Sequence, residues 1–187
     1  KSLYNKLMSQ LKVNSIIPTV GVATDQGGGI VQTILGEKRT NVSQSVASGA
    51  NGSSAVLSAT ITPTSTSSKV KISGSVTVGM SNPSNVVYIK LFKDGSELSA
   101  ASSSETAGSR QTGVIGSDLI DYQWQVSTIP FHYIDSPSTT SATTYQIILS
   151  HSSGNSMTLY LNRSHTDGTD SSYGYTASHM ILQEVSA

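Results

Sequence analysis

The sequence has no cysteine, few charges and no long apolar run, and each absence narrows the class of protein. Without cysteine among its 187 residues, the chain cannot be a disulfide-stabilised domain, so core burial or oligomerisation must stabilise it. The longest apolar runs are only a few residues, which excludes a transmembrane helix. Charged residues make up 12% of the chain and its formal net charge is zero. We therefore expect no contact with nucleic acid and no insertion into a membrane.

Serine and threonine take the place of the missing charges. Together they make up about 30% of the residues, whereas charged side chains alone account for about a quarter of an average globular protein. Hydroxyl and amide groups must therefore keep the surface wetted. The length suits one β domain with a short extension. The chain begins with Lys1 and not with Met, and we expect it to be a piece of a longer protein.

The first 28 residues follow a different pattern from the rest. Leucines recur every four residues from Leu3 to Leu11, which predicts a short amphipathic helix. Two heptads are too short for a stable isolated helix. Either a coiled-coil segment that leads into an oligomer or a helix packed on its own domain would account for this leucine spacing. A linker rich in glycine and proline follows. We assign 1–28 to this N-terminal helix and linker, and 29–187 to one β-sandwich domain.

From residue 29 onward, apolar and polar residues alternate as they do in half-buried β-strands. Asp94-Gly95 predicts a two-residue hairpin turn. Gly74, on the buried face of its strand, predicts a bulge or a close approach. No helical pattern separates the strands, which predicts an all-β fold, an antiparallel β-sandwich of the jelly-roll type. The predicted strands cover 30–35, 57–61, 69–78, 86–93, 96–98, 123–134, 145–149, 157–161 and 175–185.

The order of several segments adds a resemblance to a known family. The segments are TITPTSTSSKVKISGSVTV, YIKLFKDGSEL, YIDSPSTTSATTYQIIL and LYLNRSHTDGTDSSYG followed by SHMILQEV. Over 29–187 the chain resembles the C-terminal domains of tail-fibre and other virion structural proteins of bacteriophages, including those that infect marine bacteria. The resemblance implies a jelly roll similar to the trimeric C1q and tumour-necrosis-factor heads. It also implies a homotrimer that joins other virion proteins at the surface of the virus particle, at the tip of a fibre or spike.

The histidine and serine residues do not form a sequence motif of a known active site. His132, His151, His165 and His179 make none of the spacings typical of zinc ligands. We expect the first and last of them in the core or an interface, and the other two in loops. No GxSxG motif marks a nucleophilic serine. We therefore expect no catalytic residue, no metal site and no cofactor.

The acidic residues allow two further hypotheses. Asp167 and Asp170 lie on either side of a glycine, but the loop lacks the terminal glutamate of an EF-hand. This favours a tight solvated turn over a calcium site. Asp118, Asp121 and Asp135 could supply the carboxylate pair that glycan cleavage needs, yet they occur where polar loop acids are expected. We therefore predict that the protein is not an enzyme.

The aromatic residues allow both a structural and a binding role. Exposed rings can stack on sugars, whereas buried rings contribute large apolar areas to a core or to a trimer axis. We expect Trp124, which shares its strand parity with Tyr122, in the core or at a trimer axis. For Tyr173 and Tyr175 both interpretations stay open.

These observations predict a non-enzymatic fibre or spike domain whose loops contact a host surface, with a surface glycan as a candidate partner. Binding residues concentrate on loops, and the predicted contact loops are 99–118, 135–143 and 163–173. A purely structural module, such as a capsid decoration or trimerisation knob, is the main alternative, and a polysaccharide-degrading tip is the third hypothesis. The candidate receptor-binding residues are Asp135, Asp167, Asp170, Tyr173 and Tyr175.

Overall fold

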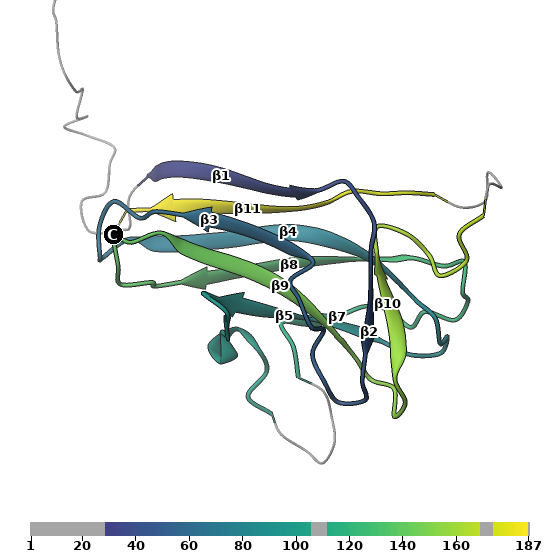
Figure 1. Cartoon of the computed structure of the whole chain (residues 1–187). Coiled ribbons are helices and arrows are strands. Elements are labelled where there is room, and N and C mark those ends of the chain that lie inside the picture. The colour runs from purple at the N-terminus through teal and green to yellow at the C-terminus, as the bar shows by residue number, and fades with distance from the viewer. Residues whose placement is uncertain (1–28, 106–111, 169–173, 187) are drawn as a thin grey trace, which may run out of the picture.

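The computed structural model of the chain describes residues 29–105, 112–168 and 174–186. Figure 1 shows these residues as an elongated structure built almost wholly from strands. No helix in them is long and apolar enough to cross a membrane. In chain order the elements are β1 (Ile30–Lys38), β2 (Val42–Val46), β3 (Leu57–Ile61), β4 (Lys69–Met80), β5 (Val87–Lys93), β6 (Ser96–Glu97), η1 (Ser99–Ala101), β7 (Ile115–Gly116), β8 (Ser127–Asp135), β9 (Thr143–His151), β10 (Met157–Leu161) and β11 (Ser178–Val185).

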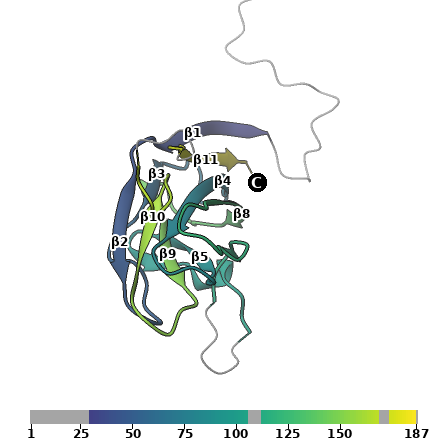
Figure 2. The same ribbon diagram turned by 90° about the vertical axis from the view of Figure 1, so that its right-hand side faces the viewer.

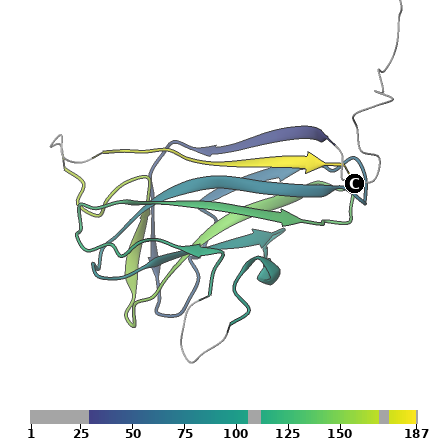
Figure 3. The same ribbon diagram turned by 180° about the vertical axis from the view of Figure 1, so that it is seen from behind.

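The strands form two antiparallel sheets that pack face to face. In the first sheet, β1, β11, β4 and β8 lie side by side in that order, as Figure 3 shows, and β10 joins the far end of β4 to β2. In the second sheet the order is β3, β9, β5, with β6 and β7 both pairing with β5. Each sheet thus takes neighbouring strands from the two halves of the chain, which is the wrapping of a jelly roll. The predicted all-β fold, an antiparallel β-sandwich, is confirmed, whereas the helix and linker predicted over 1–28 lie outside the described residues.

The alternating pattern places the apolar residues of both sheets in one core. In β4, the longest strand, Val70, Ile72, Val76 and Val78 are all fully buried. Gly74 continues this buried face, and a Cβ atom there would overlap the carbonyl group of His179 on β11. The pairing between the two strands runs through Gly74 without a shift. The glycine therefore permits a close approach of β11, and the alternative of a bulge is wrong.

The hairpin between β5 and β6 confirms the turn that Asp94-Gly95 predicts. Both residues have positive φ, 49° for Asp94 and 82° for Gly95, as a type I′ turn requires. The Asp94 carboxylate accepts a hydrogen bond from the backbone N–H of Thr144 at 2.8 Å. This bond links the turn to β9, the next strand of the same sheet.

The predicted strands and loops differ from the structure most clearly in three places. A strand, β2, occupies 42–46, where none is predicted, because it pairs with β10 through backbone bonds that do not depend on an apolar pattern. The polar stretch 99–118 contains the helix η1 and the short strand β7. The strand predicted to begin at 123 begins at Ser127 as β8, because a turn precedes it, in which Gln125 N–H donates to the Tyr122 carbonyl at 3.1 Å.

One of the four histidines lies elsewhere than predicted, and two others keep only one of their two predicted places. His132 and His179 are exposed on the outer face of the first sheet, so their predicted place in the core is wrong and only an interface role stays open. His151, predicted in a loop, ends β9 and is 1% exposed. Its Nδ1 accepts from the N–H of Ser153 at 3.2 Å and its Nε2 lies 3.0 Å from the Val46 carbonyl. These two bonds stabilise the buried ring.

The sandwich has two distinct ends. At the entry end, defined by Gly29, the loop 136–142 and Ser186, the first and last described residues meet, and the N–H of Ser186 donates to the Gly29 carbonyl at 3.3 Å. The distal end is defined by the loops 81–86 and 117–126 and by residues 162–168 and 174–177, and Figure 2 looks onto it. The register confirms this separation, since β8 begins at the distal end and reaches the entry end at Asp135.

Candidate functional site at the distal end

Two exposed aromatic side chains stack on each other at the distal end. The ring centroids of Tyr122 and Trp124 lie 4.8 Å apart and the ring planes differ by 12°. Tyr122 is 55% exposed and Trp124 is 59% exposed. The prediction that Trp124 fills the core is therefore wrong, whereas its alternative place at a trimer axis stays a prediction. In the sequence, the sign of the pair is that its two aromatic residues are two positions apart. Residues with this spacing also share one face of any β-strand, so the spacing alone does not predict an exposed stacked pair.

The pair lies on a turn that the rest of the distal end holds in place. Ile120 is fully buried and its carbonyl accepts from the N–H of Ser84 at 2.7 Å. The Gln125 side chain accepts from the N–H of Asp121 at 3.0 Å, and the Gln123 side chain donates to the Ser81 carbonyl at 3.3 Å. These bonds fix the backbone on both sides of the rings, so the stacked geometry is formed in advance.

A polar cluster lies next to this turn, because the N–H of Thr166 donates to the Gln123 carbonyl at 3.1 Å. In the cluster, the Tyr175 hydroxyl donates to Asp167 at 2.6 Å, and Arg163 lies 3.5 Å from the other carboxylate oxygen. The hydrogen bond to Asp167, reinforced by the charge of that carboxylate, raises the pKa of Tyr175 above its ordinary value. The distal end therefore combines stacked rings with a hydrogen-bonded charged pair.

Arg163 makes several contacts within the cluster. Its guanidinium lies 4.2 Å from the centroid of the Tyr160 ring and donates through Nη1 to the carbonyls of Ser164 at 3.0 Å and His165 at 3.2 Å. The Tyr160 hydroxyl is 2.7 Å from Nδ1 of His165. His165 lies in the loop, as predicted. The arginine therefore helps to organise its own loop.

A buried asparagine anchors the cluster to the sandwich. Asn162 is 0% exposed and has a φ of 64°, a conformation that asparagine tolerates better than most residues. Its amide nitrogen donates to the carbonyls of Lys38 at 2.7 Å and Thr40 at 3.0 Å. Its carbonyl oxygen accepts from the Ser178 hydroxyl at 2.6 Å. One side chain thus joins the β1–β2 junction to the end of β10 and the start of β11.

The structure brings together only some of the predicted receptor-binding residues. Asp167 and Tyr175 contact each other at the distal end and are both exposed. Asp170 and Tyr173 lie outside the described residues. Asp135 lies at the entry end of β8, at the opposite end of the sandwich. The receptor-binding role of all five stays a prediction, but they do not make one surface.

Asp135 is enclosed by a buried network. It is 7% exposed and accepts from the Lys93 ammonium group at 2.9 Å and from the Tyr145 hydroxyl at 2.7 Å. Burial and this hydrogen bond raise the pKa of the fully buried Tyr145 hydroxyl far above its ordinary value. Its position between two donors leaves the Asp135 carboxylate little surface for a ligand.

The carboxylates considered for glycan cleavage are also separated. Asp118 and Asp121 are exposed in the distal loop 117–126, and Asp135 lies nine strand residues further on. At roughly 3.3 Å a residue, β8 spans about 30 Å, whereas the two carboxyl groups of a glycosidase lie within about 10 Å of each other. Asp135 therefore cannot form a catalytic pair with either residue. Within the described ranges no three acidic or histidine side chains gather as a metal site would require.

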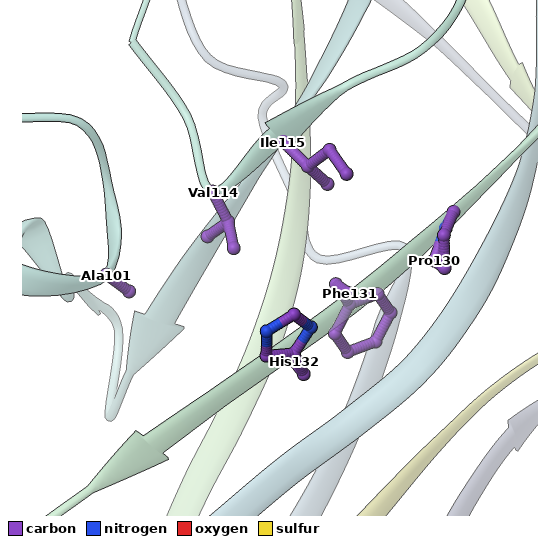
Figure 4. A pocket seen from close by; sticks show the side chains of 6 residues that line it. All are labelled: Ala101, Val114, Ile115, Pro130, Phe131 and His132. Atoms are coloured by element: carbon purple, nitrogen blue, oxygen red, sulfur yellow. The ribbon is translucent and has the colours of Figure 1, made fainter.

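A shallow pocket lies at one open edge of the sandwich, between β8 and the segment that leads into β7. Figure 4 shows Pro130, Phe131 and His132 on the β8 side, with Val114, Ile115 and Ala101 opposite them. Its volume is about 160 Å³, below the roughly 300 Å³ at which pockets for organic ligands begin. The apolar lining and the small volume favour a packing defect between two sheet edges over a ligand site.

No model of a known protein family matches the sequence, and no curated protein sequence matches it. Among solved structures, the chain is similar to the Gt strain structure of infectious bursal disease virus, with a TM-score of 0.40 and 12% identity over 91% of this chain and 44% of that one. It is also similar to the VP2 subviral particle of the same virus, with a TM-score of 0.40 and 14% identity over 91% and 45%. The chain spans less than half the length of these neighbours. At these values the likeness carries no inference about function.

Proposed function

We propose that this chain is a non-enzymatic virion structural protein, a fibre or spike domain of a bacteriophage that attaches the particle to a host surface. One observation carries the proposal. The exposed pair of Tyr122 and Trp124 lies in loop 117–126 of the distal end, opposite the entry end at Gly29, which residues 1–28 precede in the sequence. A domain carried on a stalk through its entry end would present its distal end to a cell. The resemblance over 29–187 supports the same function.

The construction of the distal end suits an adhesion surface. Loops on a rigid scaffold are where binding residues concentrate, and Ile120 and Asn162 tie these loops to the buried core. The chain as a whole is rich in hydroxyl groups and low in charge, while the distal end itself carries the exposed carboxylates of Asp118 and Asp121. These features favour an attachment module over a catalytic one.

The outer face of the first sheet supports assembly as a homotrimer. Leu35 on β1 is 62% exposed and Ile134 on β8 is 59% exposed, and the register places both on the face turned away from the core. On the same face β4 presents the small side chains of Ser73 and Ser75 and the exposed Lys71, which lies directly opposite Ile134. A second copy could pack over the two serines. Three copies on one fibre would raise the avidity of weak single sites without any new contact.

Cell binding tests the attachment function. Fluorescently labelled protein is incubated with a panel of bacterial strains, marine isolates included, and bound protein is measured by flow cytometry. We expect binding to at least one strain, lost when loop 117–126 is replaced by a glycine–serine loop of equal length and retained when loop 136–142 at the entry end is replaced in the same way. Equal binding by both variants would contradict a distal attachment surface.

Light scattering on the eluting protein tests the trimer. We expect a mass near three times the 19.5 kDa of one chain, and loss of that mass when Leu35 and Ile134 are both changed to Glu. A wild-type monomer would contradict the homotrimer.

A purely structural knob or capsid decoration is the second candidate, and the exposed apolar residues Leu35 and Ile134 favour it. Such a module would form the trimer and bind no cell of the panel. The combination of a stable trimer, absent cell binding and failure of particle assembly in the Leu35→Glu, Ile134→Glu variant would identify it.

A further inference from the structure

We infer that the stacked rings of Tyr122 and Trp124 form the contact site for a neutral pyranose unit of a surface glycan. The inference rests on the proposed attachment function and names the chemistry of its ligand. Pyranose rings carry patches of C–H groups on one face, which pack against aromatic rings, while their hydroxyl groups donate to carboxylates and carbonyls. The 117–126 loop offers both kinds of group, since the exposed carboxylates of Asp118 and Asp121 lie on the same loop as the rings.

The size of the apolar surface favours a sugar over a protein partner. A tyrosine and a tryptophan side chain each carry about 150–250 Å², and here each residue is a little more than half exposed. The two together therefore offer roughly 200–300 Å². A stable protein interface buries about 800 Å² on each partner. The exposed pair is too small for that, whereas the outer face of one stacked ring is enough to contact one sugar ring.

The arrangement of the rings excludes the other common ligand of exposed aromatics. Quaternary ammonium groups bind within cages whose rings surround the cation. Tyr122 and Trp124 differ in plane by only 12°, so they cannot enclose a cation between them. Nearly parallel rings leave flat outer faces free, and a flat face is the shape on which a pyranose stacks.

The charges of the distal end favour a neutral sugar over an acidic one. The nearby charged side chains that have no ion-pair partner among the described residues are Asp118 and Asp121, both acidic. Arg163, in the loop bonded to this turn, is held by Asp167, by two carbonyls and by the Tyr160 ring. Among the described residues, a uronic or sialic acid would meet these two carboxylates, and the nearby Arg163 is already paired with Asp167. We therefore expect discrimination against anionic sugars.

The turn also lowers the entropic cost of binding. The bonds that hold Gln123 and Gln125 fix the backbone on both sides of Trp124. Groups that are already ordered lose less freedom when a ligand binds. A single stacked sugar still contributes little binding free energy, and we expect a dissociation constant of about 1–50 mM for one site. Several copies on a fibre would bind together with a higher avidity.

Trp124 is the only tryptophan of the chain, so its fluorescence reports on this site alone. The full chain is titrated with methyl β-glucopyranoside, methyl β-galactopyranoside and N-acetylglucosamine, up to about 100 mM, and with glucuronic acid at the same pH. We expect a saturable change with at least one neutral sugar, and binding of glucuronic acid weaker by about fivefold or more. A linear response to every neutral sugar, or equal affinity for glucuronic acid, would overturn the inference.

Variants of Tyr122 keep the reporter and test the stacking. Tyr122→Ala should weaken sugar binding about 3- to 10-fold, Tyr122→Phe should keep wild-type affinity, and Val31→Ala, at an exposed position of β1, is the matched control. Circular dichroism and thermal unfolding establish that each variant is folded. Wild-type affinity in Tyr122→Ala would contradict the site.

Cell binding separates the inference from the proposed function. If wild-type protein binds cells and Trp124→Ala binds them equally well, the sugar site is wrong while the attachment function stands. If the sugar titration saturates but wild-type protein binds no cell of the panel, the site stands and the attachment function is wrong.

Discussion

The entry end and the distal end each hold a tyrosine, an aspartate and a basic side chain, but only the distal set faces solvent. At the entry end, the Tyr145 hydroxyl donates to Asp135 at 2.7 Å, and Lys93 lies 2.9 Å from the same carboxylate. Tyr145 is 0% exposed and Asp135 is 7% exposed. For this buried set, an unpaired group would be costly, because water cannot replace the lost partner.

At the distal end, the Tyr175 hydroxyl donates to Asp167 at 2.6 Å and Arg163 lies 3.5 Å away. Here Tyr175 is 67% exposed. The pKa of this hydroxyl is raised mainly by its hydrogen bond to Asp167, whereas burial is the main cause for the tyrosine at the entry end. The same groups therefore stabilise the fold at one end and remain accessible to a ligand at the other.

Among the polar groups of the two ends, the largest expected effect comes from the loss of an aspartate, and the two aspartates are removed in parallel. Asp135→Ala leaves the buried Tyr145 hydroxyl and the Lys93 ammonium group without their acceptor, and we expect a loss of about 2–4 kcal/mol in the free energy of unfolding. Asp167→Ala removes an exposed pair and should cost less than about 1 kcal/mol. Urea denaturation of both variants measures the difference. Equal losses would show that burial does not distinguish the two sets.

A second variant tests whether the distal end is anchored to the core beneath its exposed surface. Asn162→Ala deletes three hydrogen bonds of a fully buried amide and places alanine at a φ of 64°. We expect a loss of about 2–3 kcal/mol in the free energy of unfolding, because this side chain belongs to the buried part of the distal end. Asn162→Gly is the control, because it tolerates the positive φ and reports the loss of the bonds alone. A change below about 0.5 kcal/mol would contradict an anchoring role.

The entry end holds a second buried carboxylate, which makes stability depend on pH. Glu184 is 0% exposed and accepts from Gln32 at 2.6 Å and from the N–H and hydroxyl of Thr64, both at 2.7 Å. Burial opposes ionisation, but these hydrogen bonds outweigh it and lower the pKa to about 2 from 4.5. Its contribution is complete above the unfolded pKa of 4.5 and is lost as the pH falls toward 2.

Glu184→Gln tests this dependence. We expect the variant to be less stable than wild type by about 1–2 kcal/mol at pH 7, with the difference shrinking as the pH falls from about 4.5 to 2. Thermal unfolding at several pH values measures both curves, and the Glu37→Gln variant, which removes a carboxylate from an exposed ion pair, is the control. A difference that stays constant over this range would contradict the lowered pKa.

The smallest effect on stability is expected for the aromatic pair. Trp124→Ala removes a side chain that is 59% exposed, and we expect a change within about 0.5 kcal/mol. Phe131→Ala, which removes an aromatic ring that is 5% exposed, should cost about 3–5 kcal/mol. Thermal unfolding measures both variants. A large loss in the free energy of unfolding for Trp124→Ala would mean that the aromatic pair stabilises the fold.

The strands with clear alternation could be predicted from sequence, whereas the placement of loop residues could not. The predicted range 57–61 agrees fully with β3, and the range 69–78 lies within β4. Trp124 was misplaced because aromatic residues usually gain from burial, and a turn of local hydrogen bonds overrides that tendency here. His151 was misplaced because its stabilising partner, the Val46 carbonyl, is 105 residues away in sequence.

The sequence by itself determined a hydroxyl-rich, all-β chain of zero net charge and without disulfides, and also the turn at Asp94-Gly95. It could do so because composition, alternation and turn chemistry act over a few neighbouring residues. Only the tertiary structure decided that Asp135 is enclosed while Asp167 is open, and that Tyr122 and Trp124 stack in solvent. Burial depends on which distant segments cover a side chain, and the strand order of the jelly roll sets that. The candidate site is therefore a product of topology, formed from loops that the strand order brings to one end.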